Sequence, residues 1–102
     1  MAVYNRFVVS QPSAGTTLIA AAVPGRRHKV FGFIMCLVNN NGTYKFTSSS
    51  GDLTGAIFQA SNQPPANIFW HDPIIETALD SSLSLVTTSG AGRGIVVFMT
   101  EP

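Results

Sequence analysis

RRHKVFGFIMCLV, residues 26–38, is the stretch that decides the fold of this chain. A basic cluster leads directly into nine residues without a charge. At the period of two that a strand imposes, both sides are apolar, with Phe31, Phe33, Met35 and Leu37 on one and Val30, Gly32, Ile34, Cys36 and Val38 on the other. Such a segment predicts a central strand that has the core on one face and another surface, most simply a second subunit, on its other face.

The rest of the chain reads as short strands separated by turns rich in Pro, Gly, Asn and Ser, without an amphipathic helix. Residues 94–99 form a second segment that is apolar on both sides, so it too is expected to lie centrally. About eight strands at this spacing predict one all-β domain over residues 1–102, an antiparallel β-sandwich or barrel. Residues 1–9 are expected to form a docking N-terminal arm or an edge strand.

Two glycine-containing segments are expected to turn hairpins. Pro24-Gly25 separates the strand-like residues 16–23 from the long central strand, which predicts a hairpin between those two. Residues 90–94 carry three glycines but lack the Lys-Ser/Thr ending of a phosphate loop and precede a strand, so they are also interpreted as a turn.

Composition points to a chain with a partner. Charged residues make up 11% of the sequence and hydrophobic residues 45%, which is little charge for a small domain that stays alone in water. The net charge of +1 provides no basic face for direct nucleic-acid binding. No apolar run reaches the length of about 20 residues that a membrane span needs, and the N-terminus lacks the apolar region of a signal peptide. We therefore expect a protein made and used in the cytoplasm, or assembled there into something larger, with neither nucleic acid nor membrane as a direct partner.

No pattern of catalytic or metal-binding residues is recognisable. His28 and His71 lack partners at ligand spacing and are interpreted as surface or interface histidines. The carboxylates form no recognisable pair, and no Gly-x-Ser-x-Gly motif occurs. The single cysteine, Cys36, is expected to be a small buried side chain. The sequence thus predicts no enzyme activity, no cofactor and no metal site.

Two clusters remain as candidate binding residues. Arg26, Arg27 and Lys29 are a solvated start of the long strand, a contact to an acidic partner surface or a direct contact to nucleic acid, for which the accompanying aromatic residues of a stacking platform are missing. Phe69 and Trp70 are core residues, a subunit-interface anchor or a platform on which sugars stack.

Several segments together resemble the small jelly-roll decoration (cement) proteins on the heads of tailed bacteriophages. The similar segments, within residues 26–100, are Arg27-His28-Lys29-Val30-Phe31-Gly32-Phe33, Tyr44-Lys45-Phe46-Thr47-Ser48-Ser49, Asp52-Leu53-Thr54-Gly55, Glu76-Thr77, Leu83-Ser84-Leu85 and Gly94-Ile95-Val96-Val97-Phe98. The resemblance implies a β-sandwich of jelly-roll type that binds the major capsid protein on the outside of the head. It also implies a homotrimer that stabilises the shell and is located on the virion.

The resemblance implies contacts but no catalytic residues. In that family an N-terminal arm can contact the shell, and Tyr4, Arg6 and Phe7 are the residues of this chain in that position. Arg26, Arg27 and Lys29 are further candidates for the capsid contact, and Phe69 and Trp70 are candidates for the subunit interface.

Two other functions stay open. A carbohydrate- or receptor-binding β-sandwich module of a phage fibre or spike would need Trp70 exposed together with Phe69 or Tyr44. A jelly-roll protein that builds the shell itself is disfavoured, because such proteins are usually longer and carry a basic arm that this chain lacks.

Overall fold

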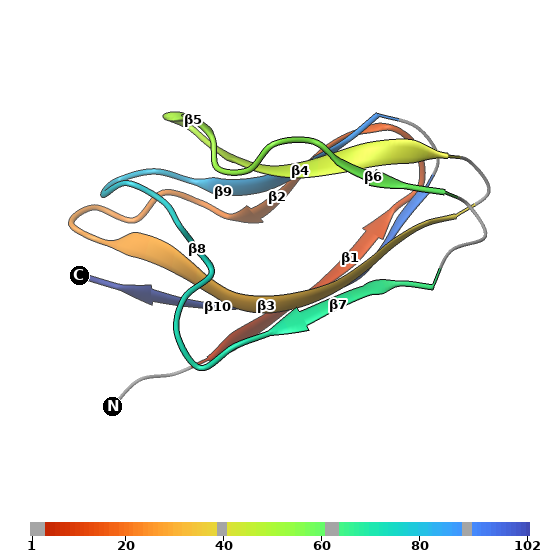
Figure 1. Cartoon of the computed structure of the whole chain (residues 1–102). Coiled ribbons are helices and arrows are strands. Elements are labelled where there is room, and N and C mark those ends of the chain that lie inside the picture. Colours follow the sequence, from red (N-terminus) through yellow and green to blue (C-terminus); the bar gives the residue numbers. More distant parts are fainter. Residues whose placement is uncertain (1–3, 39–40, 61–63, 89–90) are drawn as a thin grey trace.

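The computed structural model describes residues 4–38, 41–60, 64–88 and 91–102. Within these residues the chain forms ten strands and no helix. The strands make two antiparallel sheets that lie face to face as two layers of one sandwich (Figure 1). The predicted all-β sandwich is therefore confirmed.

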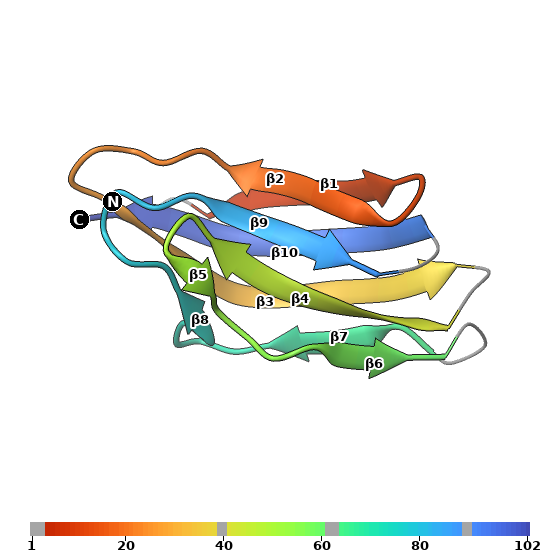
Figure 2. The ribbon, with the colours of Figure 1, turned by 90° about the horizontal axis from the view of Figure 1, so that it is seen from above.

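Each sheet has a long central strand after which we name it. The β3 sheet has the order β1-β10-β3, with two short strands on the far side of β3; its members are β1 (Asn5–Gln11), β3 (Arg27–Val38), β7 (Ala66–Phe69), β8 (Ile75–Glu76) and β10 (Ala91–Glu101). The β4 sheet has the order β2-β9-β4, again with two short strands beyond; its members are β2 (Gly15–Ala20), β4 (Gly42–Ser48), β5 (Gly51–Asp52), β6 (Ile57–Gln59) and β9 (Leu83–Thr87). Seen from above, β1 and β2 run along one long edge of the sandwich, and β6, β7 and β8 lie toward the opposite edge (Figure 2).

The chain alternates between the sheets as a jelly roll does. It passes from β1 to β2, then to β3 and β4, changing sheet each time, and later from β8 to β9 and from β9 to β10. The short strands β7 and β8 act as one interrupted strand beside β3, and β5 and β6 do the same beside β4. Counted this way, the ten strands occupy the eight positions that the sequence predicts.

Both predicted hairpins are wrong, because turn residues cannot distinguish a hairpin from a crossing between two sheets. The turn at Pro24-Gly25 connects β2 and β3, which belong to different sheets and pair with β9 and with β10 and β7. Gly92 and Gly94 lie inside β10 instead of in a turn, and Gly90 lies outside the described residues.

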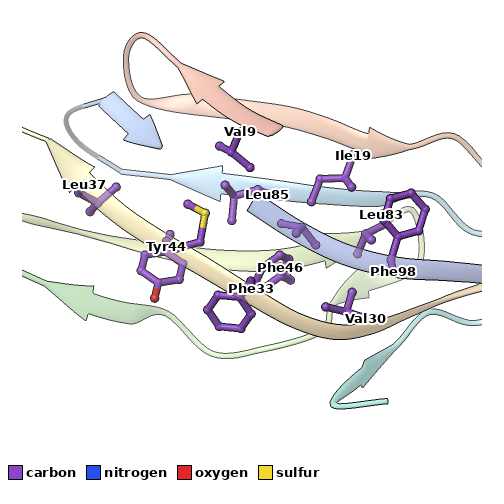
Figure 3. Close-up of a cluster of buried hydrophobic side chains, with 12 residues drawn as sticks. Val9, Ile19, Val30, Phe33, Leu37, Tyr44, Phe46, Leu83, Leu85 and Phe98 are labelled. Carbon is purple, nitrogen blue, oxygen red and sulfur yellow. The ribbon is translucent and has the colours of Figure 1, made fainter. Parts of the chain in front are cut away.

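The core lies between the sheets and takes aromatic and aliphatic side chains from both. Figure 3 shows Phe33 and Phe46 meeting across the interface of the layers, with ring centroids 5.0 Å apart. Val30, Met35, Leu83, Leu85 and Val96 are fully or almost fully buried around them. The two strands predicted to be central, β3 and β10, are indeed neighbours in the middle of their sheet.

A bulge in β3 changes which of its residues face the core. Opposite β10 the register passes from Gly32 to Val30, so Phe31 is an extra residue without a partner. Because of this slip, Val30 faces the core together with Phe33, and Phe31 faces outward. The period-of-two prediction, which placed Phe31 with Phe33, holds only for the part of β3 after the bulge.

His28 is a buried structural residue, which contradicts its interpretation as a surface or interface histidine. It is 2% exposed. Its Nε2 lies 2.8 Å from the Ala21 carbonyl oxygen and its Nδ1 lies 2.8 Å from the Thr100 hydroxyl. Since a carbonyl oxygen only accepts, Nε2 carries the proton there. The ring thus ties the loop before β3 to the end of β10.

Candidate functional site

The surface of the β3 sheet that faces away from the core is the most unusual part of the molecule. Directly paired residues in neighbouring strands point to the same side of a sheet. One row across the strands is Arg6, Val97, Gly32 and Phe69, and the next is Val8, Ile95, Ile34 and Asn67. We call this surface the outer face. Its centre is aliphatic, and the two-sided apolar pattern of β3 and β10 produces it.

This aliphatic centre is accessible to solvent. Val8 is 64% exposed, and Ile34, Ile95 and Val97 are each partly exposed. An antiparallel sheet at the surface of a domain commonly alternates, with an apolar side on the core and a polar side in water. The outer face departs from this pattern because its centre is apolar. An exposed apolar patch of this kind is typical of a surface that another molecule covers.

Aromatic rings cover one part of the outer face. Phe69 lies over Gly32, where a side chain on residue 32 would collide with the Phe69 ring and with the Ile68 carbonyl oxygen. Glycine at this position thus allows the ring to lie against the backbone of β3, a recognised way to cover a glycine in a sheet. Tyr4 meets Phe31 edge to face, with ring centroids 5.2 Å apart. Tyr4 remains 58% exposed and Phe69 47% exposed.

Trp70 continues this aromatic region beyond the end of β7. Its backbone nitrogen donates to the Phe31 carbonyl oxygen at 2.9 Å, which fixes the chain beside β3. The indole is 62% exposed and stacks on His71, with ring centroids 4.9 Å apart. The imidazole Nε2 of His71 lies 3.2 Å from a carboxylate oxygen of Asp72. Trp70 is therefore not a core residue of the single chain.

A second candidate surface lies at the short end of the sandwich that carries the C-terminus (Figure 1). Two loops, residues 21–26 and 77–82, meet there, and we call them the tip. The Asp80 backbone nitrogen donates to the Arg26 carbonyl oxygen at 2.9 Å, and the Gly25 nitrogen donates to the Asp80 carboxylate at 2.6 Å. The tip presents an exposed Arg26 and a 46% exposed Leu79.

The structure brings together four of the eight predicted contact residues. Tyr4, Arg6, Phe69 and the adjoining Trp70 all belong to the outer face or its rim, although the sequence assigned the first two to a capsid contact and the others to a subunit interface. Phe7 points the other way and packs against the core, so it leaves the candidate surface.

The predicted basic cluster is divided. Arg26 is exposed at the tip, whereas Arg27 and Lys29 are partly buried in β3, opposite Glu101 and Met99. The Lys29 ammonium lies 2.8 Å from a Glu101 carboxylate oxygen, so its charge is already paired. Of the three cations, Arg26 is therefore the most available to an acidic partner.

Sequence reasoning missed Val8, Ile95 and Val97 as surface residues. For Val8 the sequence position was informative, because it lies two residues from the charged Arg6 and the polar Ser10. In the structure these three residues are exposed and alternate with the more buried Phe7, Val9 and Gln11. Cys36 also differs from its prediction, since it is partly exposed and lies in the row of Arg93 on the outer face.

Searches for other kinds of site gave no candidate in the described ranges. No three His, Cys, Asp or Glu residues there gather as metal ligands. The same part of the chain contains no helix long and apolar enough to cross a membrane. Tyr44, which a sugar platform might have used besides Phe69, is 1% exposed and belongs to the core. No family model, curated protein or solved structure matches this chain.

Proposed function

We propose that this chain is a non-enzymatic decoration protein of a phage head, which binds the outside of the capsid as a homotrimer and stabilises the shell. The observation that carries the proposal is the exposed aliphatic outer face. A specific protein interface removes roughly 800 Å² from each partner, and the surface of the single chain is 5464 Å². The outer face and its aromatic rim supply the apolar part of such an interface.

The tip supports the capsid contact. It combines an exposed cation, Arg26, which has no ion-pair partner among the residues that the structure describes, with an exposed Leu79, and hydrogen bonds join its two loops. A preformed surface loses little conformational freedom on binding. In this proposal the tip contacts an acidic surface of the major capsid protein, while the outer face is buried between subunits. Trimers bound to an assembled shell stabilise it by mass action.

Co-sedimentation with heads tests the capsid contact. Purified protein is mixed with undecorated heads of the phage that encodes it, and binding of wild type is compared with Arg26→Gln/Arg27→Gln. This variant removes the exposed charge of Arg26 at the tip and the half-buried charge of Arg27 beside it, so binding is expected to weaken about fivefold, mainly through Arg26. Lys45→Gln is the control, because Lys45 lies on the other sheet and pairs with Asp52. Absence of wild-type binding to heads would contradict the proposed function.

A second candidate, the sugar-binding module, is favoured by the exposure of Trp70 and Phe69. Two polar groups beside the indole, on His71 and Asp72, are of the kind that binds hydroxyl groups. Titration of the protein with soluble glycans separates the two functions. We expect that none of them shifts the Trp70 fluorescence. A glycan that shifts it, with loss of the shift in Phe69→Ser, which keeps the single tryptophan as the probe, would favour the binding module.

A further inference from the structure

The two flanks of the outer face differ in chemistry. On the β1 side, defined by Arg6 and Val8, the face is aliphatic and basic. Val8 is 64% exposed, and the exposed guanidinium of Arg6 has no ion-pair partner among the described residues. Arg93, which shares a row with Ser10 on this side, adds a second exposed cation.

The opposite flank is aromatic and acidic. We call it the β7–β8 side and define it by Phe69, Trp70, Asp72 and Glu76. Glu76 is exposed at the edge strand β8. It lies opposite Lys29 in the register, but the Lys29 ammonium is paired with Glu101, and Glu76 has no ion-pair partner in the described part of the chain. The Ile74 backbone nitrogen donates to the Val30 carbonyl oxygen at 2.8 Å, and together with the Trp70 bond to Phe31 this holds the flank against β3. An exposed tryptophan is the kind of residue that dominates the energy of protein interfaces.

The charges favour one way of pairing two copies. If two β1 sides met, Arg6 would approach another Arg6, and if two β7–β8 sides met, carboxylates would approach carboxylates. Both arrangements oppose like charges, which costs affinity. A β1 side against a β7–β8 side instead joins a basic flank to an acidic one and brings Val8 toward aromatic rings. The two flanks lie on opposite edges of the sheet (Figure 2). Each copy can therefore contact one neighbour through its β1 side and another neighbour through its β7–β8 side.

We propose that copies of this chain associate head to tail, with the β1 side of one copy against the β7–β8 side of the next. Contacts between two different surfaces produce closed rings when the rotation per copy allows it. This inference rests on the proposed function in that it supplies the contacts of the homotrimer. It concerns association in solution, so it stands or falls separately from binding to heads.

Breaking each side in turn tests the head-to-tail contact. Val8→Glu disables the β1 side and Trp70→Glu disables the β7–β8 side. Leu18→Glu and Phe58→Glu are matched controls, because these side chains are exposed to a similar extent, 54% and 64%, but belong to the β4 sheet. Native mass spectrometry is expected to show trimers for wild type and for both controls, and monomers for each of the two side variants.

Mixing the two side variants gives the sharpest result. Each retains the side that the other lacks, so an equimolar mixture of Val8→Glu and Trp70→Glu should form a heterodimer and nothing larger. A monomeric or dimeric wild type, or a mixture that stays monomeric while both variants keep the wild-type circular dichroism spectrum, would overturn the inference.

The charges are tested by exchange. Arg6→Glu and Glu76→Arg are each expected to weaken association roughly fivefold, and the double variant is expected to recover it because the opposite charges are restored. A double variant weaker than both single variants would overturn the pairing of these flanks. Trimers that form normally yet fail to bind heads would refute the proposed function and leave this inference intact.

Discussion

The two sheets share one core but turn very different surfaces outward. Across the outer face, Val8, Ile95 and Ile34 lie side by side. The corresponding surface of the β4 sheet carries mostly hydroxyl and charged groups, in rows such as Leu18, Ser84, Thr47 and Asp52 and Thr16, Val86 and Lys45. The exposed apolar side chains of the β4 sheet, Leu18 and Phe58, lie on its outer strands β2 and β6, so this sheet comes closer to the alternation of a sheet that faces water. The fold requires one apolar side of each sheet, so the apolar outer face of the β3 sheet is not explained by the core of the single chain, and this is the basis for proposing that a second copy covers it.

The largest expected effect comes from Gly32, where the outer face depends on a missing side chain. Gly32→Ala places a methyl group against the Phe69 ring and the Ile68 carbonyl oxygen, so β7 must shift away from β3. We expect the free energy of unfolding to fall by about 1–3 kcal/mol, as in other overpacked sites. Urea denaturation measures it. Gly55→Ala is the control, because nothing lies within 4 Å of the added carbon there. Equal stabilities for the two variants would contradict the tight contact between Phe69 and β3.

A smaller effect is expected from Tyr44, which projects from the β4 sheet into the shared core. Its hydroxyl is buried and has no hydrogen-bond partner in the part of the chain that the structure describes. Removing an unpartnered buried polar group relieves its desolvation cost. We therefore expect Tyr44→Phe to raise the free energy of unfolding by about 1 kcal/mol at pH 7. A marked loss of stability would show that the hydroxyl makes a bond.

The same tyrosine predicts a sensitivity to alkaline pH. Burial raises the pKa of the Tyr44 phenol above its usual value of about 10, and the nearby Cys36 raises it further. The folded state therefore holds this proton more tightly than the unfolded state. The stability that comes from this tighter proton binding is fully present below the unfolded pKa of about 10, and it is lost as the pH rises through the higher pKa of the folded state. Thermal unfolding between pH 8 and 11 should show a weaker pH dependence in Tyr44→Phe than in wild type, and an equal pH dependence in the two proteins would contradict this role of the phenol.

The smallest effect is expected on the polar surface of the β4 sheet. Lys45 and Asp52 form an exposed ion pair there, with 3.0 Å between nitrogen and oxygen. Such pairs contribute about 0–1 kcal/mol and are screened by salt. Lys45→Gln should therefore change the free energy of unfolding by less than about 1 kcal/mol and leave the native mass unchanged. A change of native mass would mean that the β4 sheet also takes part in association.

Particular residues show what the sequence could and could not predict. The two-sided apolar pattern of residues 30–38 and 94–99 correctly placed β3 and β10 at the centre of their sheet, because strands flanked by a neighbour on each side are commonly the most apolar of a sheet. The bulge at Phe31 left no such mark, since it depends on the register against β10. His28 looked like part of a charged surface, and only the fold places the Ala21 carbonyl and the Thr100 hydroxyl beside its two nitrogens.

The candidate site was predictable in its residue types but not in its geometry. Phe69 and Trp70 were recognisable as an unusual pair, yet their exposure depends on the short, interrupted edge formed by β7 and β8. That Arg6 and Glu76 lie on opposite flanks of one face follows from strand order, which local sequence does not contain.

The most direct test of a covered outer face is the native mass of the wild-type chain across a wide range of concentrations. We predict a stable species of three times the 10.8 kDa of one chain, with the Trp70 fluorescence blue-shifted relative to the monomeric Val8→Glu variant. A wild-type monomer that persists at high concentration, with the same fluorescence as Val8→Glu, would contradict the central claim that a second copy covers this face.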